Sequence, residues 1–388
     1  MNPENFYFSV FLRLLWLKLV QWFFERNEMK TGIAHLPLHG GKAPAWLFNR
    51  MTKLAREIVR VMLYDADSVE LLRRLSDPFW FQALGCVLGF DWHSSGLTTT
   101  VCGAIKEGIR GMEHELGFFA GGGKGRVSRR TPDEILSFGK HLSIDPEKLV
   151  YASRMSAKVD SAAVQDGYQL YHHVFFFNRE GSWAVVQQGM NDATRYARRY
   201  HWLATEQVNF VCEPHQAICC ESRGETLNLV AQEGEENRRS CSLFAAEKPE
   251  RVIQEVTKLA TLNLPARHQV LRDEIKPENL HRILLKTYEA GPDNFEALLS
   301  IRGVGPKTLR ALSLLSELVY GAAPSFRDPA RYSYAHGGKD GHPYPVNREV
   351  YDSSIAFLKE VVNSAKIGEP EKKRSFQSLA TFSDELNP

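Results

Sequence analysis

The stretch Leu298–Arg310, which reads LLSIRGVGPKTLR, constrains the fold of this chain more than any other. Apolar residues recur at helical spacing on both sides of its centre: Leu298, Leu299 and Ile301 before it, and Leu309, Leu312 and Leu315 after it. At the centre, two glycines permit the positive φ angles of a tight turn, and Pro306 suits the first turn of a helix. The sequence therefore predicts two helices joined by a short turn at Gly303-Val304-Gly305.

The turn of this hairpin also has the chemistry of an anion site. The first N–H groups of a helix have no partner inside the helix and lie at the positive end of its dipole. Lys307 and Arg310 add positive charge beside them. The segment resembles the helix-hairpin-helix module, which implies that the Gly303, Val304 and Gly305 amides hold a DNA phosphate without sequence specificity. The alternative is a plain helical hairpin that uses glycine only to turn.

Composition limits the function classes that remain. The chain has 388 residues, a formal net charge of +2 and six cysteines. Because the net charge is near zero, any nucleic-acid signal must be local, and so few cysteines in a long chain favour a reduced, cytoplasmic protein. Arg13 and Lys18 interrupt the apolar segment Phe6–Phe24, and each charge costs about 2.5–3.5 kcal/mol in a spanning helix, so we expect no membrane span. An interfacial amphipathic helix is the alternative, but we expect this segment to be an extension outside the fold and the protein not to bind a membrane.

Several stretches along the chain match one family. They read TGIAHLPLHGGKAPAWLFNRM from Thr31, FWFQALGCVLGFDWHSSGLTTTV (Phe79–Val101), AKVDSAAVQDGYQLYHH (Ala157–His173), WAVVQQGMN (Trp183–Asn191) and ARRYHWL (Ala197–Leu203). Together with the hairpin, they resemble the bacterial and archaeal family known as domain of unknown function 763. The resemblance runs from Met29 to about residue 362. Because that name carries no activity, the chemistry is inferred from the residues.

A second basic segment, Gly121–Arg130, reads GGGKGRVSRR. Its glycines expose backbone N–H groups, and it holds four cations without an acid between them: Lys124, Arg126, Arg129 and Arg130. This composition suits a phosphate backbone, although a mobile solvated loop explains it equally well. The Walker spacing is absent, so no nucleotide cofactor is expected.

The segment Arg154–Asn191 gathers the residues most suited to catalysis. Two apolar, β-favouring stretches, Tyr171–Asn178 and Ser182–Gln188, predict a hairpin in the interior of a sheet. The candidate catalytic residues lie in the span before this hairpin (Lys158, Asp160 and Asp166) and at the ends of its strands (His173 and Gln187). The two aspartates are candidate ligands for Mg²⁺ or Mn²⁺, which prefer oxygen, and the lysine would stabilise charge on a phosphate. Alternatively, Lys158 and Asp160 pair on the surface and Asp166-Gly167 is a turn.

Basic and aromatic residues then alternate through Arg195–Trp202. Such a mixture suits a nucleic-acid groove, where rings stack on bases and guanidinium groups bind phosphates. On a helix, Arg195 and Arg199 would share one face. A solvated helix surface is the alternative.

These observations predict an α+β fold of two domains. We expect an extension outside the fold at residues 1–28, a mixed α/β domain with a central β-hairpin or sheet and the active site at 29–220, and a polar, exposed linker at 221–247. An all-helical domain with the helix-hairpin-helix would follow at 248–365, and the polar tail 366–388 would be disordered.

Three functions fit this organisation. The first is a metal-dependent nuclease or other DNA-repair enzyme that cleaves phosphodiesters. The second is a DNA glycosylase or lyase that uses Lys307, since GVGPK resembles the corresponding motif of helix-hairpin-helix glycosylases. That family's aspartate falls at Asn347 here, which cannot serve as an ionised carboxylate. The third is a DNA-binding protein without catalytic activity.

Overall fold

The computed structural model describes residues 38, 43–65, 67–90, 95–205, 208–221, 223–259, 277–330 and 348–386. All of these residues belong to one compact unit, Gly32–Pro388. The predicted extension at residues 1–28 lies outside the described residues, as does Asn347. Within the described ranges, no helix is long and apolar enough to cross a membrane.

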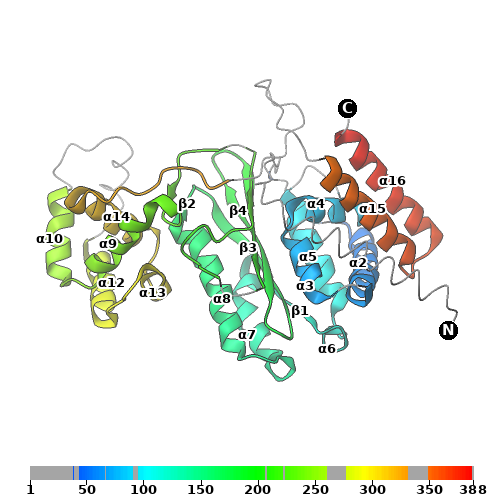
Figure 1. Cartoon of the computed structure of the whole chain (residues 1–388), viewed down its shortest axis with the longest axis horizontal. Helices are drawn as coiled ribbons and strands as arrows, with labels where there is room; N and C mark the ends of the chain where they lie inside the picture. The colour runs from blue at the N-terminus through cyan, green and yellow to red at the C-terminus, as the bar shows by residue number, and fades with distance from the viewer. Residues whose placement is uncertain are drawn as a thin grey trace. The chain divides into compact units, whose positions relative to one another are not determined.

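A five-stranded antiparallel sheet with the order β1-β3-β4-β5-β6 occupies the centre of this unit (Figure 1). Its strands are β1 (Phe118–Lys124), β3 (Gln169–Asn178), β4 (Trp183–Asn191), β5 (Tyr196–Ala204) and β6 (Ala217–Cys219). The predicted hairpin is confirmed: β3 and β4 pair with each other and both lie inside the sheet. A second, two-stranded sheet pairs β2 (Val164–Gln165) with β7 (Leu227–Asn228).

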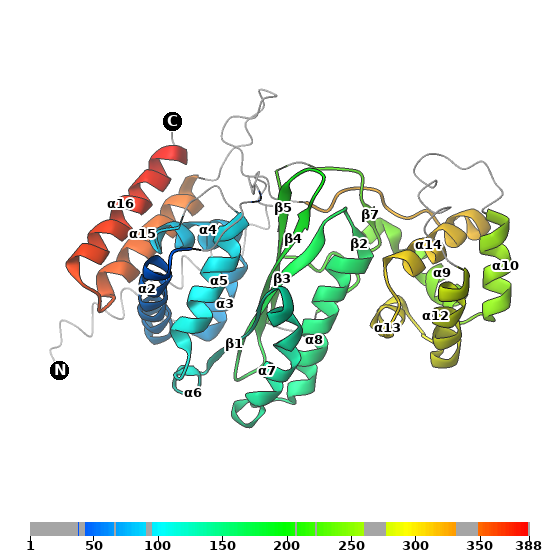
Figure 2. The same cartoon turned by 180° about the vertical axis from the view of Figure 1, so that it is seen from behind.

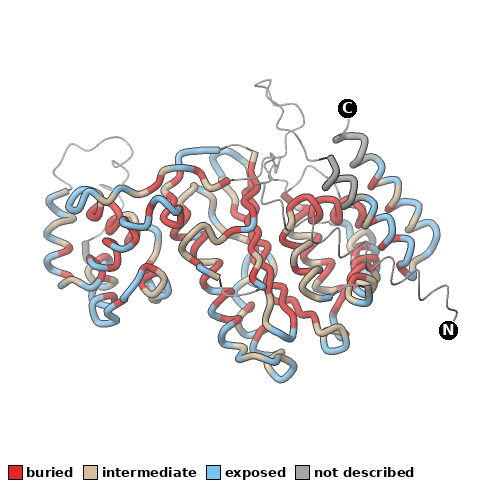
Figure 3. The backbone as a smooth tube through the Cα atoms, in the orientation of Figure 1, coloured by how far each residue is buried: buried red, intermediate tan, exposed pale blue. Residues whose placement is uncertain are grey.

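Successive side chains of each strand point to opposite faces of the sheet, so the strands contribute to two separate cores. On β3, Val174 and Phe176 join one core, and Phe175 and Phe177 join the other. The strands are buried along most of their length (Figure 3). Burial on both faces explains why the VFFF and WAVV stretches are continuously apolar.

The first core is completed by helices from both ends of the described chain. They are α2 (Ala45–Asp65), α3 (Ser68–Ser76), α4 (Pro78–Val87), α5 (Ser95–Ile109), α15 (Arg348–Ser364) and α16 (Glu369–Leu386). The Asp77 carboxylate caps α4 by accepting hydrogen bonds from the Phe79 and Trp80 N–H groups, and Pro78 opens the helix. The short helix α6 (Glu113–Leu116) leads into β1.

The second core lies on the opposite face of the sheet, where α7 (Thr131–Ser137) and α8 (Pro146–Lys158) pack (Figures 1 and 2). It continues into the helices that carry the predicted hairpin: α9 (Glu235–Ala245), α10 (Pro249–Leu259), α12 (Pro277–Ala290), α13 (Phe295–Ser300) and α14 (Pro306–Tyr320). The fold is therefore α+β with a helical C-terminal region, as predicted.

Two segments differ from their predicted organisation. The stretch 221–247, expected to be an exposed linker, contains α9, whose Cys241, Phe244 and Ala245 are buried in the second core. The stretch 366–388, expected to be disordered, contains α16, and Leu379 of that helix is buried in the first core. Both sequences are mostly polar, but their few apolar residues recur at helical spacing, which suffices to bury one face.

Candidate functional site

The predicted helical hairpin is present in the structure as α13, a turn and α14. Gly303 has a φ of 105°, a value that favours glycine. Gly305 precedes α14, and neither a side-chain cap nor an acid in the first turn occupies that end of the helix. Val304 is buried at 2% exposure and its N–H donates to the Ile301 carbonyl at 3.2 Å. Within the described ranges, the backbone N–H groups of Gly303 and Gly305 have no backbone acceptor.

Three side-chain contacts hold this turn against the rest of the chain. Lys158, the last residue of α8, donates from Nζ to the Ile301 carbonyl at 2.5 Å. Gln165 donates from Nε2 to the Pro306 carbonyl at 2.9 Å and accepts from Arg310 Nε at 2.8 Å. Burial lowers the pKa of Lys158 to about 8. Lys158 and Arg310 therefore position the hairpin, a role that sequence reasoning did not assign to either.

The Asp160 carboxylate is the centre of a buried polar cluster on the second face of the sheet. Asp160 belongs to a π-helical turn, η3 (Val159–Ala163), that continues α8. Its Oδ2 accepts hydrogen bonds from Gln187 Nε2 at 2.6 Å and Trp202 Nε1 at 2.9 Å. Its Oδ1 lies 2.5 Å from His215 Nε2. Three protein side chains therefore form hydrogen bonds with this carboxylate, which is fully buried.

His173 connects this cluster to Ser153. The His173 Nδ1 lies 2.8 Å from Gln187 Oε1, and its Nε2 lies 2.9 Å from Ser153 Oγ. Both His173 and Ser153 are buried, and burial lowers the pKa of His173, so its ring is neutral at pH 7. The α8 helix positions Ser153, and it begins at Pro146 with the Asp145 carboxylate accepting from the Glu147 N–H at 3.0 Å.

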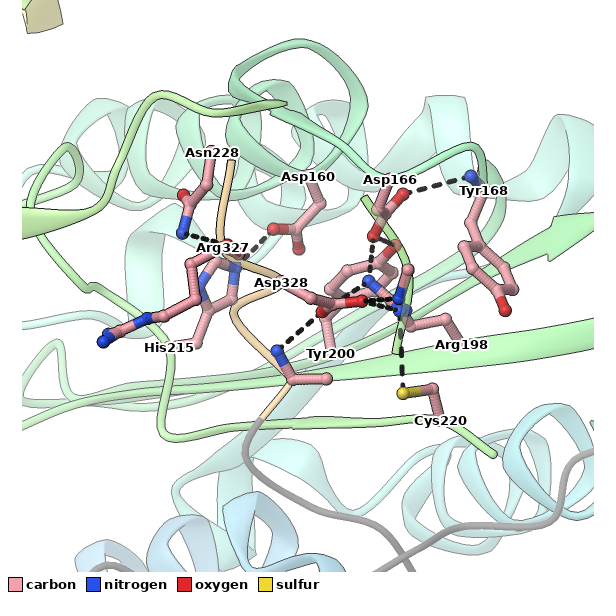
Figure 4. A network of polar contacts seen from close by, with 12 residues as sticks. Asp160, Asp166, Tyr168, Arg198, Tyr200, His215, Cys220, Asn228, Arg327 and Asp328 are labelled. Carbon is pink, nitrogen blue, oxygen red and sulfur yellow. Dashed lines mark hydrogen bonds and ion pairs between the residues drawn. The ribbon is translucent and has the colours of Figure 1, made fainter. Parts of the chain in front are cut away.

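Asp166 belongs to a second polar cluster, which is built around Arg198 (Figure 4). Arg198 Nη1 lies 2.9 Å from Asp166 Oδ2, and Arg198 Nη2 lies 2.7 Å from Asp328 Oδ2. The Tyr200 hydroxyl also donates to Asp166 Oδ2, at 2.7 Å. The three charged side chains are at most 4% exposed, so this network ties the segment before α15 to the sheet.

The two aspartates predicted as metal ligands thus bind protein donors in separate clusters. The described residues contain no group of three or more His, Cys, Asp or Glu side chains arranged to hold a metal ion. The Mg²⁺ or Mn²⁺ site at Asp160 and Asp166 stays a prediction, as does metal-dependent nuclease activity.

A pocket of about 290 Å³ opens beside Ser153 and His173. Residues from three elements line it: Ser128, Arg129 and Pro132 near the start of α7; Ser153, Arg154 and Ala157 of α8; and Leu170, Tyr171, His172 and His173 of β3. Arg129 lies in the 3₁₀ turn η1 (Gly125–Arg130), and both arginines are exposed. Of the predicted catalytic residues, the structure brings His173, Gln187 and Asp160 together, and His173 also lines this pocket.

The basic segment before α7 is more ordered than a loop. Gly121–Lys124 forms the end of β1, where Gly122 pairs with Val174. A Cβ on Gly122 would lie 2.2 Å from the His173 carbonyl oxygen, so close strand approach explains this glycine. Lys124, Arg129 and Arg130 are exposed. These three cations remain available to an anion.

The prediction that Arg195 and Arg199 share a helix face is wrong. Arg195 lies in the turn before β5 with a φ of 63°, and Arg199 lies within the strand. Arg199 is fully buried, donates to Gln82 Oε1 at 3.1 Å, and lies over the Phe81 ring at 5.0 Å. A side chain enclosed in this way cannot contact DNA.

Sequence reasoning missed Ser153, Arg154, His215 and Asp328. Ser153 and Arg154 stand in a helix with no motif around them, and only their position across from β3 gives them a role. Asp328 binds Arg198 across 130 residues of sequence, and His215 binds Asp160 across 55. No spacing pattern along the sequence predicts that these residues form pairs.

Comparison with known proteins shows the family of the chain. No curated protein and no solved structure matches it. The sequence profile described as "Protein of unknown function (DUF763)" matches residues 32–346, which is most of the 388-residue chain. This range includes the sheet, both polar clusters, the pocket and the hairpin. The chain therefore belongs to the DUF763 family.

Proposed function

We propose that this protein binds the phosphate backbone of DNA through the α13–α14 hairpin, without sequence preference. One observation carries the proposal: the N–H groups of Gly303 and Gly305 have no backbone acceptor among the described residues, at the uncapped start of α14. Unsatisfied N–H groups at the positive end of a helix dipole bind an anion well. A backbone phosphate reaches such a turn because glycine leaves room for close approach.

The charges around the turn support the same ligand. Arg302 and Lys307 are exposed on either side of the glycines, and the first turn of α14 carries no acid. Lys158 brings a third basic side chain to the Ile301 carbonyl, at the base of the turn. A basic surface of this kind releases counterions from DNA, so binding would weaken steeply with salt.

The contacts of the turn with α8 support a rigid binding surface. Lys158 and Gln165 bind the carbonyl oxygens of Ile301 and Pro306, which lie directly before and after the turn. Because both carbonyls are engaged, the backbone of the turn is held in one conformation. A preorganised anion site loses less conformational entropy when it binds.

We also propose that the protein acts in the cytoplasm, where its six free cysteines would stay reduced.

The test is binding of the full chain to a labelled, random-sequence DNA duplex, measured by fluorescence anisotropy. Lys307→Gln removes one charge at the turn, and Lys53→Gln removes the same charge from an exposed position on α2. We expect Lys307→Gln to weaken binding several-fold and Lys53→Gln to leave it unchanged. Equal effects of the two substitutions, or no binding by the wild-type chain, would contradict the proposal.

A further inference from the structure

The contact between Ser153 and His173 has the geometry of a nucleophile beside its general base. The Ser153 hydroxyl lies 2.9 Å from His173 Nε2, within the range that general-base catalysis requires. Both residues line the pocket of about 290 Å³, so a bound molecule would lie beside the hydroxyl. Ser153 itself is only 3% exposed, so a reacting group must enter the pocket to reach it.

The hydrogen bonds behind His173 determine which ring nitrogen carries the proton. Gln187 donates from Nε2 to Asp160 Oδ2 at 2.6 Å, and this bond directs its Oε1 toward His173. Because an amide oxygen only accepts hydrogen bonds, His173 Nδ1 must be the donor. Nε2 of the neutral ring is then unprotonated and accepts from the Ser153 hydroxyl. Asp160 thus orients the base through one amide group.

The other side of the pocket points to an anionic substrate. Arg129 and Arg154 line it, and the described residues that line it include no acid. Arginine binds phosphate oxygens with two parallel hydrogen bonds and stabilises the charge that develops during phosphoryl transfer. A hydroxyl, a base and two guanidinium groups around one cavity therefore match a phosphate ester.

We propose that Ser153 and His173 form a hydrolytic site for phosphate esters in this pocket. Ser153 Oγ attacks phosphorus and its proton passes to His173 Nε2. The bond from phosphorus to the leaving oxygen breaks, and that oxygen takes the proton from His173. Water then attacks the phosphoserine with His173 accepting its proton, the phosphorus–Oγ bond breaks, and Ser153 regains the proton. Arg129 and Arg154 hold the non-bridging oxygens throughout.

This site is independent of DNA binding by the hairpin. It shares no residue with Gly303, Gly305 or Lys307, and a small phosphodiester needs no contact with them. Turnover of a small substrate and binding of a DNA duplex can therefore succeed or fail separately.

The first test is hydrolysis of bis(p-nitrophenyl) phosphate by the full chain in the presence of EDTA. Ser153→Ala removes the nucleophile, and we expect the rate to fall at least about 1,000-fold. Ser156→Ala is the matched control: Ser156 lies one turn further along α8, is fully buried, and donates to the Ser153 carbonyl rather than to His173. It should retain the wild-type rate, provided that circular dichroism shows all three proteins folded. Equal rates for wild type and Ser153→Ala would overturn the proposal.

A second measurement needs no variant. Diisopropyl fluorophosphate transfers its phosphoryl group to an activated serine with loss of fluoride. Trypsin cleaves after Lys148, Arg154 and Lys158, so Ser153 and Ser156 fall in different peptides, LVYASR and MSAK. Mass spectrometry should find the adduct on Ser153 in the first peptide, with fragmentation excluding Tyr151. An unlabelled Ser153, or an adduct only at another residue, would overturn the proposal.

Discussion

The Asp160 carboxylate accepts a hydrogen bond from Gln187 Nε2 at 2.6 Å, and both side chains are fully buried. Together with a bond from the same nitrogen to the Ser156 carbonyl at 3.2 Å, this contact determines the direction of the Gln187 amide and, through it, the tautomer of His173. Trp202 and His215 complete the shell of the carboxylate. A buried carboxyl group with three hydrogen-bonding partners is costly to disturb, so Asp160 should be essential to the stability of the fold.

Asp160→Asn should lower the free energy of unfolding by about 3 kcal/mol, because an amide cannot accept hydrogen bonds on both of its polar atoms. At the Oδ2 position the introduced amide nitrogen would face two donors, Gln187 Nε2 and Trp202 Nε1, and at the Oδ1 position it would force His215 into the tautomer whose Nε2 accepts. Ser161→Ala, at the exposed neighbouring position, should change stability by less than about 0.5 kcal/mol. Urea unfolding at pH 7 measures both. Equal midpoints for Asp160→Asn and wild type would show that the carboxylate does not hold the cluster together.

Buried histidines should make the protein less stable in acid. Burial lowers the pKa of His172 to about 3 and also lowers the pKa of His173 and His201. Below the ordinary pKa of 6.5, the unfolded chain binds protons that the folded chain does not. Stability contributed by neutral histidines is therefore complete above that pH and declines as the pH falls, by up to about 1.4 kcal/mol per pH unit for each histidine.

The measurement is the urea midpoint at several pH values from neutral down to about pH 5. His172→Phe should flatten the dependence, because it removes a group whose pKa is about 3 in the folded chain. Both ring nitrogens of His172 are buried without a hydrogen-bond partner among the described residues, so the substitution breaks no hydrogen bond there. A midpoint that does not fall in acid would mean that these histidines are protonated in the folded chain.

Asp328 should stabilise the fold through Arg198 although it lies far away in sequence. Their side chains are 4% and 1% exposed and lie 2.7 Å apart. Asp328→Ala leaves a buried guanidinium with one carboxylate fewer, and it should cost about 3 kcal/mol or more. Arg327→Ala, next to it, breaks only a 3.8 Å bridge to Glu213 from a side chain that is 73% exposed, and it should cost less than about 1 kcal/mol. Similar losses for both would contradict this account.

Gly303→Ala should impair the hairpin. At a φ of 105° any side chain is strained, and a Cβ would lie 2.8 Å from Ile283 Cδ1. We expect a loss of about 1–3 kcal/mol in stability and weaker DNA binding, since the turn must change its conformation. Gly224→Ala is the control, because a Cβ there meets nothing within 4 Å. Unchanged DNA binding by Gly303→Ala would show that the turn does not bind the phosphate.

The elements that were predicted correctly all carry a local signal. The β3–β4 hairpin has two apolar stretches around a turn, and α13–α14 has helical spacing around two glycines. The prediction of a helix at Arg199 is wrong although the local sequence contains the pattern of a strand. Large side chains recur at every second residue there, which is the period of a strand: Tyr196, Arg198, Tyr200 and Trp202. The two-residue period, rather than the basic character of the segment, predicts its structure.

The candidate site needed the structure because its parts meet only in the folded chain. Ser153 and His173 are 20 residues apart, on a helix and a strand whose packing sequence alone does not define. Lys158 was predicted to be catalytic, but its contact with the Ile301 carbonyl spans 143 residues. Side-chain chemistry selected His173, Gln187 and Asp160 as candidates, whereas the contacts that join them to one another and to Ser153 depend on the tertiary structure.

The most direct test of the proposed function is the salt dependence of DNA binding by the full chain. The logarithm of the association constant should fall linearly with the logarithm of salt concentration, as phosphate contacts require. Lys307→Gln should reduce the magnitude of that slope by about 0.9, the value of one lost phosphate contact, and Lys53→Gln should not change it. A wild-type chain that does not bind DNA at low salt, or a slope that Lys307→Gln leaves unchanged, would contradict binding through the hairpin.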